Sequence, residues 1–233
     1  MLGILGGMGP LATADFLTKL INATPATRDE DHLPVIVYSV PQIPDRPAAI
    51  TSGGSTPLPA MLTGVRTLKY AGVQAIAIAC NTAYYWHAEL EREGGVRILH
   101  IADAACAELA ALMPAAPEGT TVGLMGTTGT LVAGFYQKRL EARGYRVLAN
   151  TPEDQERWVL PAIRDVKSND LAAAGPRIEQ AVHQLEAAGA EAIVLACTEL
   201  PLAIERARLT LAVPCVDTTA ALARACVRWW KER

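Results

Sequence analysis

Short apolar runs alternate along this chain with longer segments in which apolar and polar residues are mixed. The short runs, several of them ended by glycine or proline, predict buried parallel strands, and the longer segments predict helices that cover them. We expect strands at residues 2–5, 35–40, 75–79, 121–125, 145–149 and 191–196. We expect helices at residues 12–22, 61–71, 82–93, 131–143, 153–167, 170–188 and 218–231. This alternation predicts an α/β fold in which strands feed helices through right-handed crossovers.

A long segment, residues 41–59, fits neither pattern. It is rich in proline, glycine, serine and threonine, so we expect a loop there. Loops of this length in compact domains are usually functional, which makes this segment a candidate part of a binding site.

The two halves of the chain resemble each other. Residues 71–82 (AGVQAIAIACNT) match residues 188–198 (AGAEAIVLACT), and residues 3–11 match residues 123–131. A weaker pair joins residues 98–103 to residues 212–217. All three pairs keep one order and nearly one separation, which indicates a duplicated half. We therefore expect two pseudo-symmetric lobes, each a mainly parallel sheet flanked by helices, with an active site in the cleft between them. The expected lobes are residues 1–103 with 214–233, and residues 104–213.

Composition narrows the class of protein. The net charge of −3 gives no electrostatic reason to expect nucleic acid or an anionic membrane as a partner. No apolar run approaches the ~20 residues that span a bilayer, and the first residues lack the pattern of a signal peptide. We expect a cytoplasmic protein. In that compartment, five cysteines are expected to be free thiols.

Two of these cysteines stand where chemistry is expected. Cys80 and Cys197 each follow an apolar strand and precede a helix, at the end of the strand where α/β proteins bind ligands. The N–H groups of a helix N-terminus stabilise a thiolate and can also bind a carboxylate. Two thiols facing each other across a cleft could remove a proton from one face of a carbon and deliver one to the other. Cys106, Cys215 and Cys226 are expected to be packing residues.

Five segments carry a resemblance to a known family. They are residues 6–13 (GGMGPLAT), 41–46 (PQIPDR), 80–83 (CNTA), 127–130 (TTGT) and 197–199 (CTE). With these segments the whole chain resembles the aspartate/glutamate racemase superfamily, whose members need no pyridoxal phosphate. It is more similar to the aspartate racemase branch than to glutamate racemase, in which a histidine commonly follows the second Cys-Thr.

The resemblance implies an amino-acid racemase, with aspartate as the best expectation for its substrate. It implies Cys80 and Cys197 as the catalytic acid and base, and Arg46 and Lys167 as the groups that hold the side-chain carboxylate. It also implies no cofactor, no metal, a small acidic amino acid as ligand, and a homodimer. The remaining implied substrate-binding residues are Met8, Gln42, Asn81, Thr82, Thr128, Thr198 and Glu199.

Two positions depart from the family pattern. Tyr84 stands where many relatives have a histidine, and Pro47 follows Arg46 where threonine is more usual. The first departure bears on the rate or the substrate range, and the second on the stiffness of the loop. Neither removes a catalytic cysteine.

Other functions remain open at this point. A glutamate racemase, a broad-specificity racemase, or a relative that acts on hydantoins, maleate or arylmalonates would share the same thiols. A non-catalytic protein that binds an acidic amino acid would share the arginine but would not need two symmetric cysteines. A dinucleotide site is disfavoured because Ala12 stands where the third glycine of G-x-G-x-x-G would follow Gly7 and Gly9. A metal site is disfavoured because the histidines are scattered, at His32, His87, His100 and His183.

Overall fold

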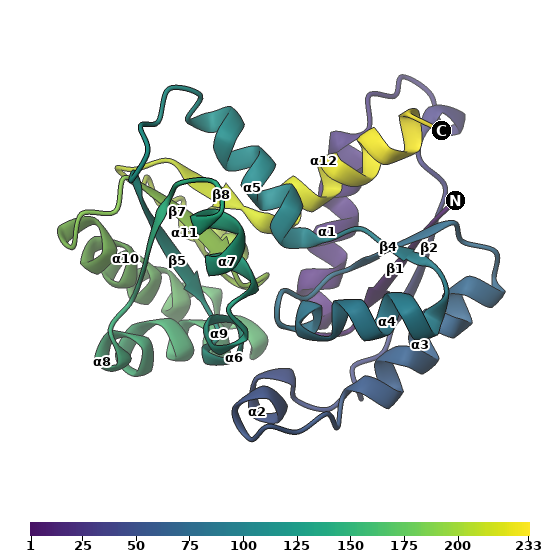
Figure 1. The fold of residues 1–233 in the computed structure, drawn as a ribbon, viewed down its shortest axis with the longest axis horizontal. Coiled ribbons are helices and arrows are strands. Elements are labelled where there is room, and N and C mark those ends of the chain that lie inside the picture. Colours follow the sequence, from purple (N-terminus) through teal and green to yellow (C-terminus); the bar gives the residue numbers. More distant parts are fainter. The chain divides into compact units, whose positions relative to one another are not determined.

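The computed structural model describes residues 1–233, which divide into two compact units. The first unit comprises Met1–Ala104 with Thr219–Arg233, and the second comprises Ala105–Thr218. We call these units the first lobe and the second lobe. Each contains a four-stranded parallel sheet with flanking helices (Figure 1), which confirms the predicted α/β fold of two lobes.

The sheet of the first lobe has the strand order β2-β1-β3-β4. Its strands are β1 (Leu2–Gly6), β2 (Val35–Ser39), β3 (Ala75–Ile78) and β4 (Arg97–Ile98). All residues of β1 and β3 are buried, because these two central strands carry helices on both faces. The helical elements are α1 (Pro10–Ala23), η1 (Asp29–Asp31), α2 (Arg46–Thr51), α3 (Leu58–Tyr70), η2 (Thr82–Trp86), α4 (His87–Gly94), the start of α5 (Ile101–Leu112) and nearly all of α12 (Thr218–Lys231).

The sheet of the second lobe has the equivalent strand order β6-β5-β7-β8. Its strands are β5 (Thr121–Gly126), β6 (Arg146–Ala149), β7 (Ala192–Ala196) and β8 (Cys215–Asp217). The core of this lobe joins β7 to buried side chains of two helices, among them Ile163 and Ile178. The helical elements, besides the rest of α5, are α6 (Thr128–Ala133), α7 (Phe135–Glu141), α8 (Pro152–Asp154), the π-helical turn η3 (Gln155–Val159), α9 (Leu160–Lys167), α10 (Leu171–Ala187) and α11 (Leu200–Ala207).

Three differences from the sequence-based expectations concern the long loop, one helix and the lobe boundary. The expected loop 41–59 contains α2, whose N-cap Asp45 accepts a hydrogen bond from the backbone N–H of Ala48 at 2.7 Å. The expected helix 131–143 is two helices, because Gly134 adopts a left-handed conformation with φ 68°. The second lobe extends to Thr218 rather than to residue 213, because β8 pairs with β7 in parallel.

Glycines allow close backbone approaches at the carboxyl ends of both first strands. Gly7 has φ +91°, and a Cβ atom there would lie 2.4 Å from the backbone of Val40. At Gly126, a Cβ atom would lie 2.7 Å from the carbonyl oxygen of Ala196. A side chain at either position would displace backbone, so these glycines keep the strand ends tightly packed.

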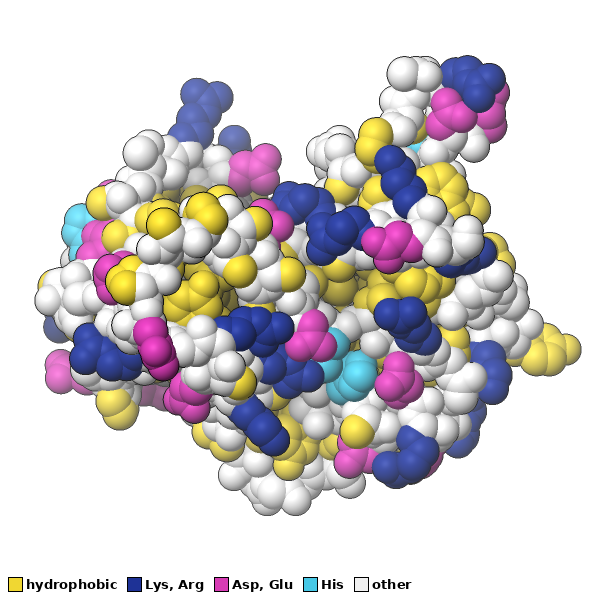
Figure 2. All heavy atoms as spheres, turned by 45° about the horizontal axis from the view of Figure 1, so that its top comes forward, with side chains coloured by type: hydrophobic (Ala, Val, Ile, Leu, Met, Phe, Trp, Pro, Cys, Tyr) yellow, Lys and Arg dark blue, Asp and Glu magenta, His cyan; other side chains and the backbone are white.

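The surface carries charges of both signs. On the face drawn in Figure 2, lysine and arginine side chains are interspersed with aspartate and glutamate, in keeping with the net charge of −3. None of the helices is both long enough and apolar enough to cross a membrane.

Candidate active site

Cys80 lies at the carboxyl end of β3 in the first lobe. The β1–β3 ladder continues to the residue before it, since the Ala79 N–H donates to the Leu5 carbonyl at 3.0 Å. The cysteine is only 5 % exposed, and the next two residues, Asn81 and Thr82, are also buried. The chain then enters η2. The buried thiol is thus followed directly by polar groups at the edge of the sheet where α/β folds bind ligands.

The glycine-rich turn after β1 occupies the same edge of this sheet. The Thr13 hydroxyl fixes the turn, because it accepts from the Gly7 N–H at 2.9 Å and donates to the Gly9 carbonyl at 2.8 Å. Met8, at the centre of the turn, is 2 % exposed. The Thr13 hydroxyl therefore connects the first residue of the turn to its last.

Arg46 is a buried guanidinium in the first turn of α2, 8 % exposed. Its Nη1 donates to the carbonyls of Ile43 and Pro44 at 3.0 and 2.9 Å, and its Nη2 donates to the carbonyl of Met8 at 3.4 Å. Its Nε is buried without a hydrogen-bond partner. A buried cation held by neutral carbonyls favours the approach of an anion, since a carboxylate would offset the cost of desolvation. Gln42, nearby in the sequence, is exposed.

Tyr84 connects the ends of β3 and β4. Its hydroxyl accepts from the Ile78 N–H at 3.1 Å and donates to the Leu99 carbonyl at 3.0 Å. Burial raises the pKa of Tyr84 well above its usual value, so the hydroxyl stays protonated and keeps both bonds. Its ring lies 6.0 Å from that of His87 and 5.0 Å from that of His100. The Tyr84 hydroxyl therefore links the end of β3 to the residue after β4.

Cys197 lies at the carboxyl end of β7 in the second lobe and is 4 % exposed. Its Sγ donates to Oε2 of Glu199 at 3.0 Å, and the Thr198 hydroxyl donates to the same oxygen at 3.0 Å. The pKa of the Cys197 thiol is raised well above its usual value, first by burial and then by the charge of Glu199 and the hydrogen bond to it. Lys167 opposes this shift through its positive charge. Lys167 itself is exposed in the last turn of α9.

The TTGT segment follows β5 on the same sheet edge as Cys197. Thr127 caps α6, because its hydroxyl accepts from the Thr130 N–H at 3.1 Å. The next residue, Thr128, is half-buried. Gly126 and Ala196 are partners in the β5–β7 register, so this segment and the Cys197 segment leave the sheet side by side.

Gln155 is a residue of this edge that the sequence analysis missed. It is 5 % exposed in the π-helical turn η3, and its Nε2 donates to the Gly126 carbonyl at 2.8 Å. Its Oε1 is buried without a partner, as is Oε1 of Glu199. No motif or spacing in the sequence singles out Gln155; the single turn of π-helix, a feature frequent at functional sites, distinguishes it in the structure.

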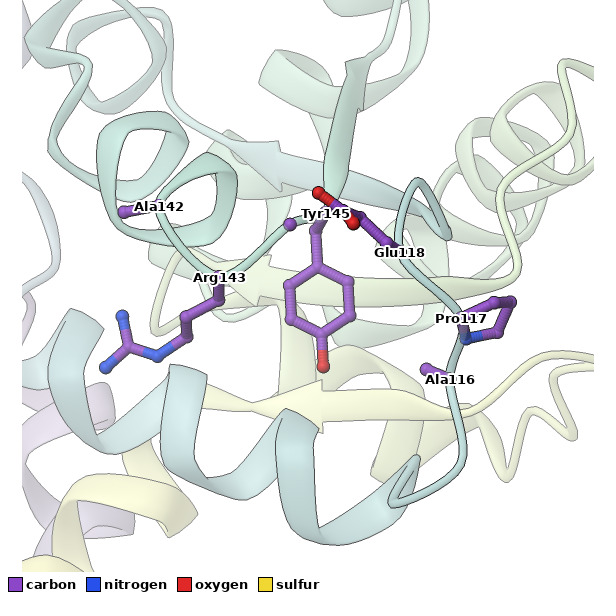
Figure 3. A pocket seen from close by; sticks show the side chains of 7 residues that line it. Ala116, Pro117, Glu118, Ala142, Arg143 and Tyr145 are labelled. Carbon is purple, nitrogen blue, oxygen red and sulfur yellow. The ribbon is translucent and has the colours of Figure 1, made fainter.

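A surface hollow of about 440 Å³ lies at the other edge of the second sheet. Its lining residues precede β5 and β6, and Figure 3 shows the ring of Tyr145 between Arg143 on one side and Pro117 on the other. This edge carries the amino ends of the strands, where the fold rarely binds substrates. In residues 1–233, no group of three or more His, Cys, Asp or Glu side chains is arranged to hold a metal ion.

Most of the expected site residues thus fall into two groups, one in each lobe. In the first lobe Met8 contacts Arg46, and Cys80, Asn81 and Thr82 form the neighbouring strand end. In the second lobe Cys197, Thr198 and Glu199 are joined by hydrogen bonds, with Lys167 acting on the thiol through its charge. The side chain of Gln42 is exposed.

The two parallel α/β lobes match the pyridoxal-phosphate-independent racemase superfamily in fold. The chain belongs to the Asp/Glu/hydantoin racemase family, whose sequence model matches residues 5–226. Membership of this family supports isomerase activity on amino acids.

Individual relatives span almost the whole chain. The broad-specificity amino-acid racemase RacX of Bacillus subtilis is 28 % identical over 233 residues, which cover 97 % of this chain and 96 % of RacX. The structure of Picrophilus torridus aspartate racemase superposes with a TM-score of 0.82 at 30 % identity, covering 98 % of this chain and 93 % of that one. Glutamate racemase from Francisella tularensis in complex with D-glutamate shares the fold, with a TM-score of 0.72 at 15 % identity and coverage of 99 % and 81 %.

Proposed function

We propose that this chain interconverts L- and D-aspartate without a cofactor, with Cys80 and Cys197 as its two bases. The observation that carries the proposal is the equivalent placement of the two buried thiols, each at the carboxyl end of the third strand of its lobe. Inversion of a stereocentre needs an acid and a base of similar kind, one for each face of the carbon. A duplicated fold with one thiol in each half supplies such a pair.

The proposed reaction has two proton transfers. In one direction a thiolate removes the α-proton and becomes a thiol, and the electron pair remains on the α-carbon. The thiol of the other cysteine then gives its proton to the opposite face and becomes a thiolate. The reverse direction exchanges the two roles, so each cysteine serves as base for one enantiomer.

Aspartate is favoured over other amino acids by Arg46. Its buried guanidinium has only carbonyl partners within the chain, and a buried Nε remains available as a donor. A dicarboxylate substrate would supply the missing negative charge, and the charge of Lys167 would add to the attraction. Asn81, Thr82, Thr128 and Thr198 are the polar groups that we expect to orient the rest of the substrate.

A broad-specificity racemase is the second candidate. Two observations favour it: the similarity to RacX along nearly the full length, and the commitment of Arg46 Nη1 to two backbone carbonyls. A guanidinium occupied in this way has fewer N–H groups free for a two-pronged grip on a side-chain carboxylate. Such a site would discriminate less strongly between aspartate and other amino acids.

The first experiment follows the purified protein, freed of pyridoxal phosphate, with L-aspartate in D₂O by NMR and chiral chromatography. We expect deuterium at the α-carbon together with D-aspartate. The same assay with glutamate and alanine separates the two candidates, since comparable turnover of all three would favour broad specificity. Absence of exchange with every amino acid tested would contradict racemisation and favour a related isomerase or a binding protein. The expected homodimer is checked on the same sample by light scattering.

A further inference from the structure

The carboxyl group of Glu199 lies directly against the sulfur of Cys197. The Sγ–Oε2 distance is 3.0 Å, and both residues are 4 % exposed. A carboxylate can only accept hydrogen bonds, so the sulfur is the donor in this contact. The Thr198 hydroxyl donates to the same oxygen at 3.0 Å and fixes its position.

Two charged groups act on this sulfur, with opposite sign and different surroundings. Glu199 is buried, whereas Lys167 acts on the thiol only through its charge and is exposed to solvent in α9. Water screens the lysine more than the glutamate, so the negative charge dominates at the sulfur. A thiolate at Cys197 would place two anions in contact inside the lobe, which raises the pKa of the thiol further beyond the effect of burial.

The matching position in the first lobe carries no charge. In the repeat, Cys80-Asn81-Thr82 corresponds to Cys197-Thr198-Glu199, so the neutral Thr82 occupies the position that matches Glu199. The two halves therefore share the thiol, but only the second half has a carboxyl side chain at the second position after it.

We propose that Glu199 keeps the proton on Cys197 in the resting protein, so that the resting form acts on the enantiomer whose α-proton faces Cys80, with Cys80 as base and Cys197 as acid. The opposite enantiomer is converted by the form in which the two protonation states are exchanged. This assignment rests on the proposed racemase function. Cys80 thiolate takes the α-proton and becomes a thiol, and the carbanion takes the proton of Cys197, which becomes a thiolate beside Glu199. The resting form returns when Cys80 loses its proton to water and Cys197 takes one from water. Glu199 is thus a positioning residue for the proton.

The test measures the reactivity of Cys197 without substrate. Wild-type chain and Glu199→Gln are treated with iodoacetamide over a range of pH, and alkylation of the Cys197 peptide is followed by mass spectrometry. Glutamine keeps the size and an acceptor oxygen but removes the charge. Glu205→Gln is the matched control, because Glu205 is an exposed residue of α11 in the same lobe.

We expect the midpoint of Cys197 alkylation to move to lower pH in Glu199→Gln and to stay unchanged in Glu205→Gln. At pH 8 the rate should rise roughly three- to fourfold for each pH unit of that shift, after allowance for the lower nucleophilicity of a more acidic thiol. A variant that only loosens the lobe would raise the limiting rate at high pH without moving the midpoint, and that result would overturn the proposal. Slower alkylation in Glu199→Gln would also overturn it, because Glu199 would then be withdrawing the proton. The measurement does not depend on turnover, so a chain that fails to racemise but shows the shift would refute the proposed function alone.

Discussion

The two lobes share a strand order, yet the surroundings of their strand-end cysteines differ. Cys80 is followed by neutral polar residues and lies near Tyr84, whose hydroxyl connects two strands. Cys197 donates a hydrogen bond to the carboxyl group of Glu199, and the charge of Lys167 partly lowers the raised pKa of its thiol. The repeated fold determines where each thiol stands, whereas burial and the neighbouring Glu199 raise the pKa of the Cys197 thiol. Equivalent positions in a duplicated fold therefore have different electrostatic surroundings here.

The largest expected effect comes from removing either thiol. Cys80→Ser or Cys197→Ser should lower racemisation by on the order of 10³-fold, within the range that a general acid or base contributes, because a hydroxyl is a far weaker acid. In D₂O each variant should exchange the α-proton of one enantiomer only, and the two variants should act on opposite enantiomers. Cys215→Ser, half-buried in β8, is the control and should retain activity. Near wild-type racemisation by either single variant would refute the two-base scheme.

A smaller effect on activity is expected at Arg46. The first lobe has this buried guanidinium, whereas Lys167 in the second lobe is exposed. Arg46→Ala should lower kcat/KM for aspartate by about 10²-fold, the equivalent of a charged hydrogen bond of about 2–3 kcal/mol, and affect alanine much less. Arg28→Ala, an exposed arginine that pairs with Asp31 in the same lobe, should leave both substrates unaffected. Equal losses for aspartate and alanine would exclude Arg46 from side-chain recognition.

The smallest effect on activity is expected at Tyr84. Tyr84→Phe removes the group that bonds the Ile78 N–H and the Leu99 carbonyl, so the free energy of unfolding should fall by about 1–3 kcal/mol. We expect kcat/KM to change by less than roughly threefold, as for a residue that acts only on stability. Urea denaturation and initial rates measure the two quantities, with Tyr70→Phe, 96 % exposed, as control. Unchanged stability with a large loss of rate would show that Tyr84 takes part in the chemistry.

Much of the fold could be predicted because buried parallel strands are continuous apolar runs. The apolar runs predict β1, β3, β5 and β7 almost to the residue, and the two cysteines follow β3 and β7. Helix α2 was missed although its signals are present, since Asp45 is an N-cap and Pro47 lies in the first turn. The proline and glycine content of the segment outweighed those two local signals.

The parts of the site that escaped prediction depend on contacts that sequence spacing does not reveal. Gln155 falls within an expected helix, but its bond to Gly126 depends on how that helix packs against β5. The lobe boundary depends on the pairing of the short β8 with β7, which is non-local along the chain. Glu199 was expected to bind substrate, but its bond to Cys197 depends on two side-chain rotamers.

The buried guanidinium of Arg46 has a consequence for the folding equilibrium. Its side chain donates to the carbonyl of Met8, which precedes β2 in the chain, and to the carbonyls of Ile43 and Pro44, which follow β2. One cation therefore connects the turn after β1 to the segment that leads into α2. An anion that pairs with this cation only in the folded lobe acts as a stabilising ligand, by about 2.7 kcal/mol at a concentration a hundred times its dissociation constant. If a dicarboxylate substrate binds Arg46 in this way, the melting temperature of the protein should rise with the concentration of that substrate.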